Sequence, residues 1–333
     1  MLEGFTLILL AVLGLAVAFD YINGFHDTAN AIATSVSTRA LKPHWAIAMS
    51  AVANFAGALT GTEVARTIGS GLIDSRAESQ VVVIAALIGA IVWNLLTWRL
   101  GLPSSSSHAL IGGLLGAGAV AAGFGTWNLN GVVGKVLVPL VSSPIAGLLL
   151  GFLLMALILN VFRRGHPKLM NDRFRRLQVV SAAFMAFSHG SNDAQKTMGV
   201  MTLALVTAGV IPEFKVPLPV ILAAATAMSL GTAAGGWRII RTMGSKVVKL
   251  DPVHGFAAET SAASIIIVAS HFGMPVSTTH VISSAIMGVG ATGRLSAVRW
   301  GVARSIAGAW VLTLPAAGLT AAIAYVLLRP ILH

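Results

Sequence analysis

The stretch GLPSSSSH at residues 101–108 returns later in the chain as GMPVSTTH at residues 273–280. Gly, Pro, one Ser and His coincide, and the two residues before the His are both Ser in the first copy and both Thr in the second. The match runs on without a gap to two further glycine pairs, Gly116/Gly288 and Gly118/Gly290. Agreement of this length indicates an internal duplication.

A second pair of polar stretches precedes these copies in the same order. Residues 23–30 read NGFHDTAN and residues 189–196 read HGSNDAQK, so that Gly and Asp coincide. The distance along the chain from each Asp to the following Pro is also similar in the two copies. We therefore predict two related halves, 1–162 and 177–333, joined by a hydrophilic loop, 163–176. We also expect both polar stretches of each half to interrupt its helices as loops.

The composition points to a membrane protein. Of the 333 residues, 56% are hydrophobic and only 10% are charged, whereas soluble globular proteins carry roughly 25% charged residues. A membrane span takes about 20 apolar residues. Stretches that reach or approach this length recur at 5–19, 45–59, 81–100, 136–162, 216–234, 260–271 and 302–328. The expected fold class is an all-α polytopic membrane protein, and matching broken helices in two halves are typical of secondary transporters.

The charged residues predict orientation and exclude some functions. The net charge is +11, but the basic residues lie at helix ends, so nucleic acid is not an expected partner. The loop 163–176 holds six Lys or Arg residues against Asp172 alone, which marks it as cytoplasmic. Residues 1–19 have no basic residue before their apolar core, so we expect a retained first span. The chain has no Cys, which excludes disulfides and thiolate chemistry.

Each Pro-Ser/Thr run is a favourable helix start, and such a start inside a membrane can bind an anion. Pro fits the first turn, and the hydroxyls cap free N–H groups. The free N–H groups, the hydroxyls and the positive end of the helix dipole converge on one point. We expect two such ends to hold one small anion through Ser105, Ser106, Ser107, Ser277, Thr278 and Thr279. The alternative is that these hydroxyls only cap helices.

Asp27 and Asp193 occupy equivalent positions in apolar surroundings. Ionisable groups inside a membrane are rare and by default functional. A carboxylate cannot attract an anion, but it can hold a coupling cation, take up a proton or accept a hydrogen bond from an acidic O–H of the ligand. Phosphate keeps such an O–H near neutral pH and sulfate does not, which favours phosphate. An ion pair or a cap within the bundle is the alternative role.

Polar neighbours extend this candidate site. Asn30 and Lys196 align, and both are expected to contact substrate together with Gln195. Lys196 could neutralise an anion or replace one bound cation. Asn192 and Glu259 are expected to hold the coupling cation with the two Asp residues, although Glu259 also fits an ordinary charged helix start.

Histidines end both Ser/Thr runs, at His108 and His280. They could relay protons, because His titrates near physiological pH, or they could hold the runs by hydrogen bonds. His26 and His189 lie near the Asp residues but do not align, so they carry less weight. No residue is assigned a catalytic role, and no metal is expected beyond a coupling sodium ion.

The four motifs resemble the PiT family of inorganic phosphate transporters, and in particular its bacterial low-affinity Pit branch. Residues 24–31 and 189–196 look like the duplicated signature of that family, 101–108 and 273–280 like its second pair, and 310–317, WVLTLPAA, like its last helix. The resemblance covers nearly the whole chain, although the long hydrophilic domain that many members insert between the halves is reduced here to 163–176.

This resemblance implies a fold, a function and partners. The implied fold is a bundle of two inverted-topology repeats with about ten to twelve transmembrane helices and re-entrant or broken helices. The implied function is symport of inorganic phosphate, in some members as a metal–phosphate complex, with H⁺ or Na⁺ and no cofactor. A multi-pass homodimer in the inner membrane of a bacterium is implied as well. Gln195 and Lys196 depart from the pattern of the first half, so the two halves need not hold the same cation.

Three other functions compete with phosphate symport. The first is a sulfate permease of the same fold. The second is an intramembrane hydrolase, which the adjacency of Ser107 and His108 suggests; however, there is no G-x-S-x-G motif, and duplication argues against a single catalytic centre. The third is a passive channel.

Overall fold

The computed structural model describes residues 6–73 and 79–332, and its regular structure there is helical. The first half contains α1 (Leu7–Ser37), α2 (Pro43–Ala58), α3 (Glu63–Ser70), α4 (Gln80–Leu100), α5 (Ser106–Ala122), α6 (Leu129–Val132) and α7 (Val138–Val161). The second half contains α8 (Pro167–Thr207), α9 (Leu218–Ala234), α10 (Trp237–Arg241), α11 (Pro252–His271), α12 (Thr278–Ala291) and α13 (Trp300–Leu332). The expected all-α class is confirmed.

Several helices are suited to cross a membrane. By length and composition, five spans qualify among the described residues: α1, α4, α6 continued into α7, α11 and α13. A sixth span is α9 with α10, a pair bent by 59° at the break between them. The 41-residue α8 is about 60 Å long at 1.5 Å per residue and carries the second Asp motif in its middle. The protein is therefore a multi-pass membrane protein with a broken helix.

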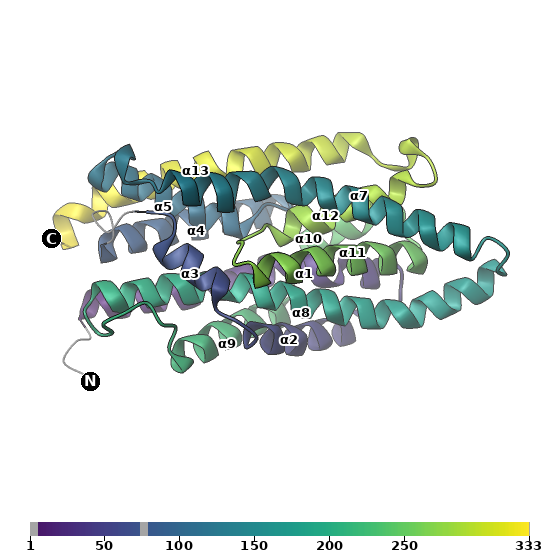
Figure 1. Ribbon diagram of the computed structural model, residues 1–333, viewed down its shortest axis with the longest axis horizontal. Helices are drawn as coiled ribbons and strands as arrows, with labels where there is room; N and C mark the ends of the chain where they lie inside the picture. Colours follow the sequence, from purple (N-terminus) through teal and green to yellow (C-terminus); the bar gives the residue numbers. More distant parts are fainter. Residues whose placement is uncertain (1–5, 74–78, 333) are drawn as a thin grey trace.

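The two halves interlock as inverted repeats. Helix α2 packs on α8 and α9 packs on α1, while α5 packs on α13 and α12 packs on α7. Each of these pairs joins one helix of each half, and the pattern is preserved when α1, α2, α5 and α7 are exchanged for α8, α9, α12 and α13. Equivalent helices run in opposite directions: α1 and α7 start at one end of the molecule, and their equivalents α8 and α13 start at the other end (Figure 1).

Both Asp motifs lie inside continuous helices, so the predicted loops at 23–30 and 189–196 are wrong. Residues 23–30 belong to α1 and 189–196 to α8. Neither stretch contains Pro, so each backbone keeps its helical hydrogen bonds and only the side chains are polar. The glycines serve close packing: Gly24 lies against the backbone of α9, and Gly190 against Asn54 of α2.

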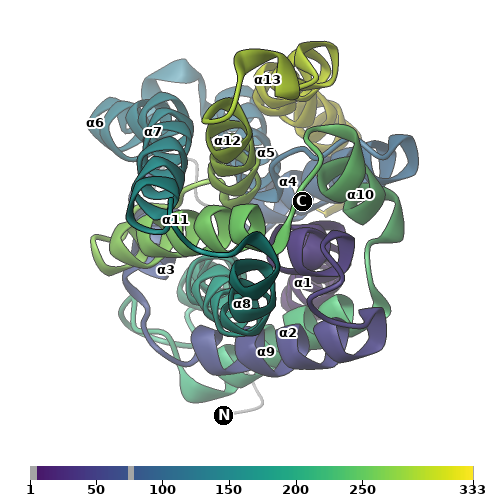
Figure 2. The same cartoon turned by 90° about the vertical axis from the view of Figure 1, so that its right-hand side faces the viewer.

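The predicted loop 163–176 is also mostly helical. Helix α7 ends at Val161, and α8 begins at Pro167, so only a short turn separates them. Pro at the first turn starts a helix rather than ending one. The four basic residues at 168–176 therefore lie on the first turns of α8, and all four are exposed. Figure 2 views the molecule from the end that carries the α7–α8 turn.

Candidate functional site

The two Pro-Ser/Thr runs are helix starts, as the sequence predicts. Ser105 is the N-cap of α5 and accepts a hydrogen bond from the His108 N–H at 3.2 Å. Ser277 caps α12 in the same way, accepting from the His280 N–H at 3.2 Å. The runs are buried, and the two starts meet, because the rings of His108 and His280 lie 4.9 Å apart between centroids. The next two hydroxyls of each run remain available for other contacts.

In each half the Asp accepts from the first hydroxyl beyond the cap. Ser106 donates to Asp27 Oδ2 at 2.9 Å, and Thr278 donates to Asp193 Oδ2 at 3.1 Å. Thus a residue in the middle of α1 meets the start of α5, and its equivalent on α8 meets the start of α12. The pairing joins the two motifs that the sequence pattern had only placed in the same half.

The residues three positions after each Asp reach across to the other half. Asn30 donates to Thr279 Oγ1 at 2.9 Å and to Thr278 Oγ1 at 3.2 Å. Lys196 donates to Ser107 Oγ, to Asp193 Oδ1 and, at 3.2 Å, to the carbonyl of Val276. These equivalent contacts tie each long helix to the helix start of the opposite repeat.

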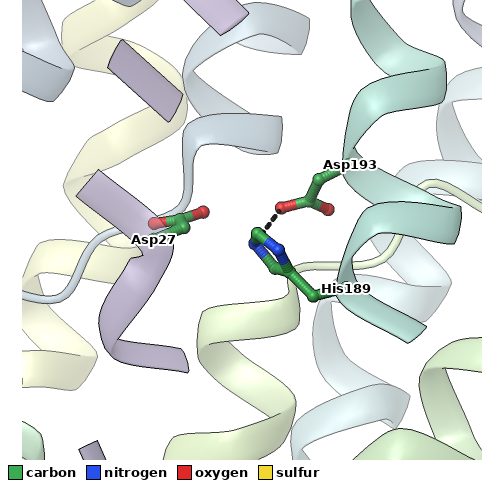
Figure 3. A group of neighbouring side chains, drawn as sticks. All are labelled: Asp27, His189 and Asp193. Atoms are coloured by element: carbon green, nitrogen blue, oxygen red, sulfur yellow. Dashed lines mark ion pairs between the residues drawn. The ribbon is translucent and has the colours of Figure 1, made fainter. Parts of the chain in front are cut away.

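The two Asp residues meet at the centre of the bundle. Asp27, His189 and Asp193 each offer one atom that could bind a metal ion, and these three atoms lie within 4.8 Å of one another (Figure 3). His189 Nε2 is 3.1 Å from Asp193 Oδ2, and all three side chains are buried. Carboxylate oxygen and imidazole nitrogen suit a metal cation, so the group has the chemistry to hold one or to share protons.

His26 and His189, which carried less weight in the sequence, are direct partners of the carboxylates. His26 Nδ1 lies 2.6 Å from Asp27 Oδ1, and its Nε2 lies 3.1 Å from Thr97 Oγ1. The two His residues sit at different offsets from their Asp, one and four positions before it. Both offsets bring a side chain beside the carboxylate, which an alignment of equivalent positions does not detect.

A family model described as "Phosphate transporter family", PHO4, matches residues 23–171 and 160–321 of the chain. The chain belongs to the phosphate transporter family. A probable low-affinity inorganic phosphate transporter of Bacillus subtilis is 50% identical over 95% of this chain and 96% of its own length. A protein of Rhizobium meliloti with the same description is 48% identical over 96% of both chains. The resemblance found in the four motifs is confirmed.

A solved structure described as "The sodium-dependent phosphate transporter" has the same fold. It superimposes on 98% of this chain and 100% of its own with a TM-score of 0.88, at 26% sequence identity. Membership in a transporter family makes the hydrolase alternative wrong. The geometry of this family member agrees, because the Ser107 hydroxyl donates to the Val276 carbonyl, at 3.3 Å, and accepts from Lys196.

Glu259 forms a separate buried cluster in this transporter. Its carboxylate accepts from Thr34 Oγ1 at 2.5 Å, from Gln178 Nε2 at 3.1 Å and from Ser181 Oγ. The donors come from α1 and α8, and Glu259 itself lies on α11. The sequence suggested an ordinary helix start as the alternative, but Glu259 is seven residues past the start of α11 and is fully buried.

The two other predicted ligands, Asn192 and Gln195, lie in different places from each other. Asn192 donates to Ser270 Oγ at 2.9 Å and to the Met274 carbonyl at 3.2 Å, beside the second run. Gln195 lies apart from the hydroxyls: its Oε1 accepts from the N–H groups of Val64 and Ala65, at 2.8 and 3.4 Å. It therefore caps the start of α3, because an amide oxygen satisfies the free N–H groups there.

His108 and His280 lie next to each other within the family fold. The ring of His280 also stacks on Trp310, with centroids 4.0 Å apart and an angle of 25° between the planes. Among the described residues, neither ring nitrogen of His280 has a hydrogen-bond partner. The pair joins the two helix starts through ring contact, not through a direct bond to either Asp.

Proposed function

We propose that this protein is a symporter that moves inorganic phosphate across a bacterial cell membrane, driven by a cation gradient. Its relatives in Bacillus subtilis and Rhizobium meliloti are described as probable low-affinity inorganic phosphate transporters. The structural relative is described as sodium-dependent. The observation that carries the proposal is the meeting of two helix starts, one from each inverted repeat, each with a carboxylate on its first free hydroxyl.

Phosphate would bind between Ser105–Ser107 and Ser277–Thr279. Its oxygens would accept hydrogen bonds from the hydroxyls and the free N–H groups, as is common at helix N-termini. Asp27 and Asp193 would accept hydrogen bonds from its O–H groups. In the structure these hydroxyls bond to Asp27, Asp193 and Val276, and the side chains are at most 2% exposed. Entry of phosphate therefore requires the two starts to separate.

The coupling cation, H⁺ or Na⁺, would bind beside the substrate at Asp27, His189 and Asp193. Lys196 already places an ammonium between Asp193 and Ser107, so one cation of the second half would be permanent. Asn192 and Glu259 remain candidate cation ligands, and His108 with His280 a candidate proton relay. A metal–phosphate complex as the transported species fits the same carboxylates.

The arrangement in the cell is proposed on the same basis. Residues 1–162 and 177–333 would form the two repeats, with 163–176 at the cytoplasmic face of the bacterial inner membrane. A homodimer is the proposed assembly. Gln195 is left out of the proposed phosphate site, because its oxygen caps α3.

Reconstitution tests this function. Purified protein in liposomes should accumulate phosphate above the outside concentration when a proton or a sodium gradient is imposed, and the gradient that works names the coupling ion. Equilibration without accumulation under both gradients would instead make the protein a channel. Excess sulfate should compete poorly; strong accumulation of sulfate itself would favour the sulfate alternative.

A further inference from the structure

A third duplicated segment lies outside the proposed phosphate site. Residues 66–70 read RTIGS, on α3, and residues 241–245 read RTMGS, beginning at the last residue of α10. Thr67 donates to the carbonyl of Gly273 at 2.7 Å, and Thr242 donates to the carbonyl of Gly101 at 2.9 Å. Each threonine thus holds the first residue of the Pro-Ser/Thr run of the opposite repeat.

The two segments lie on opposite sides of the site. Helix α3 is nearer the end of the molecule where α1 starts and α13 finishes, whereas α10 is nearer the end with the α7–α8 turn (Figures 1 and 2). Inverted repeats require this placement, because equivalent segments face opposite membrane surfaces. The residues around the two segments differ.

The first segment is the floor of a cavity of about 820 Å³. Arg66, Lys135 and Lys215 line it, all three exposed, and Glu63 is the acidic residue among the described residues that line it. Lys135 donates from Nζ to Thr67 Oγ1 at 3.3 Å. Positive charge therefore reaches the threonine that holds Gly273.

A smaller cavity lies beside this one. It has a volume of about 200 Å³, shares Glu63 and His271 with the larger cavity, and is lined by Ser191 and Gln195 of α8. Ser191 and Gln195 are each two positions from Asp193 on α8, so this cavity borders the same segment of α8 on the face away from the Asp193 side chain.

The second segment has a different neighbour. Arg238 donates from Nη1 to the carbonyl of Arg99 at 2.6 Å, and its guanidinium lies 5.3 Å from the ring centroid of Trp98. Such a cation–π contact with a backbone hydrogen bond joins α10 to the end of α4. The Arg238 side chain is thus engaged with α4, whereas Arg241 of the segment is exposed.

We propose that the cavity over residues 66–70 is an outer vestibule with its own weak binding site for inorganic phosphate, formed by Arg66, Lys135 and Lys215. The inference rests on the proposed function. Guanidinium and ammonium groups bind phosphate oxygens, and a hollow of one charge sign raises the local concentration of the opposite ion. The vestibule loads the buried site from one face only, the face opposite the α7–α8 turn.

Side-specific transport kinetics test the proposal. Phosphate uptake is measured in right-side-out and in inverted membrane vesicles for wild type, Lys135→Gln, Lys215→Gln, Arg66→Gln and the triple variant. From the outer face, each single variant should raise KM about threefold and the triple variant about tenfold or more, with kcat unchanged. KM from the inner face should stay at the wild-type value.

Two further variants and a change of ionic strength serve as controls. Arg163→Gln removes one charge at the α7–α8 turn and should leave outer KM unchanged, while Lys135→Arg should retain it. Raising ionic strength with an impermeant salt should increase the outer KM of wild type and much less that of the triple variant. An unchanged outer KM in the triple variant, or an equal rise from both faces, overturns the vestibule. Failure of the proposed function looks different, because wild type would then carry no phosphate.

Discussion

Asp27 and Asp193 are equivalent in sequence but have different neighbours. Asp27 is paired with His26 and Ser106, whereas Asp193 has Lys196 as a third partner besides His189 and Thr278. A buried carboxylate needs positive charge, protons or several donors to be stable. We therefore expect the first half to depend on a mobile cation more than the second does, because an ammonium is built into the second.

Replacing either Asp should stop transport without preventing membrane insertion. Asp27→Asn and Asp193→Asn each remove the charge that would hold the cation and the acceptor for a phosphate O–H. We expect uptake to fall at least about tenfold, because hydrogen bonds to charged groups contribute about 1.5–3 kcal/mol. Uptake in liposomes and the amount of protein in the membrane measure the two effects. Near-normal uptake by both variants contradicts the proposed roles.

Lys196→Asn gives the second half the residue found at the equivalent position Asn30. Loss of a buried partner of Asp193 leaves that carboxylate with less positive charge, so uptake without sodium should fall about tenfold or more. The vacated space between Asp193, Ser107 and the Val276 carbonyl has oxygen ligands suited to sodium. Added sodium should therefore restore part of the uptake. A sodium-independent loss would refute the idea that Lys196 replaces a cation; Lys168→Asn, at an exposed position on the first turn of α8, is the charge-matched control and should leave uptake unchanged.

At the scale of elements, contacts between the halves depend on glycine. A Cβ at Gly190 would overlap the backbone of Asn54, so α8 and α2 approach as closely as they do only without a side chain there. The same holds for Gly24 of α1 against α9. These glycines sit inside the Asp motifs, where they bring the two long helices against the partners that carry Asn54 and Thr232, themselves joined at 2.9 Å.

Gly190→Ala should destabilise the protein through this contact. Overpacking of a close interface costs about 1–3 kcal/mol, so the purified protein in detergent should lose its fold at a lower temperature. Gly14→Ala is the matched control, because a Cβ at this position of α1 meets no atom within 4 Å. The control should keep or slightly raise the unfolding temperature. Equal behaviour of the two variants would show that the helix contact is not limiting.

For the whole molecule, the equivalent segments 66–70 and 241–245 of the inverted repeats have different surroundings. One face has a cavity reaching Thr67, and the other is joined by Arg238 to the end of α4. Exchange of these two states between the repeats would move access from one face to the other while the residues of the site keep their order. Secondary transporters built from inverted repeats commonly work in this way.

The sidedness of the molecule can be checked because the chain has no Cys. Ser70→Cys places one thiol in the outer vestibule, and His166→Cys places one in the α7–α8 turn. A membrane-impermeant maleimide added to intact cells should label the first variant and not the second. Permeabilised cells should show labelling of both. The reverse pattern would place residues 163–176 outside and the vestibule in the cytoplasm.

Composition and local motifs are enough to predict the membrane class, the two repeats and a helix start at each Pro-Ser/Thr run. Few charges cannot cover a soluble protein, and Pro with hydroxyl residues favours a helix start whatever surrounds it. The family was also readable from the four motifs. These properties depend on composition and on local chemistry, which a single chain displays without folding.

Which polar residues meet depends on how the helices pack. The Asp motifs are helical because no Pro interrupts them. The expectation of loops was wrong because it rested on the run of polar side chains alone. The pairing of Asn30 with Thr279 and of Lys196 with Ser107, and the use of Gln195 as a cap, depend on how the halves interlock. Such contacts join residues far apart in the chain, and their distances follow from helix packing, which local patterns do not specify.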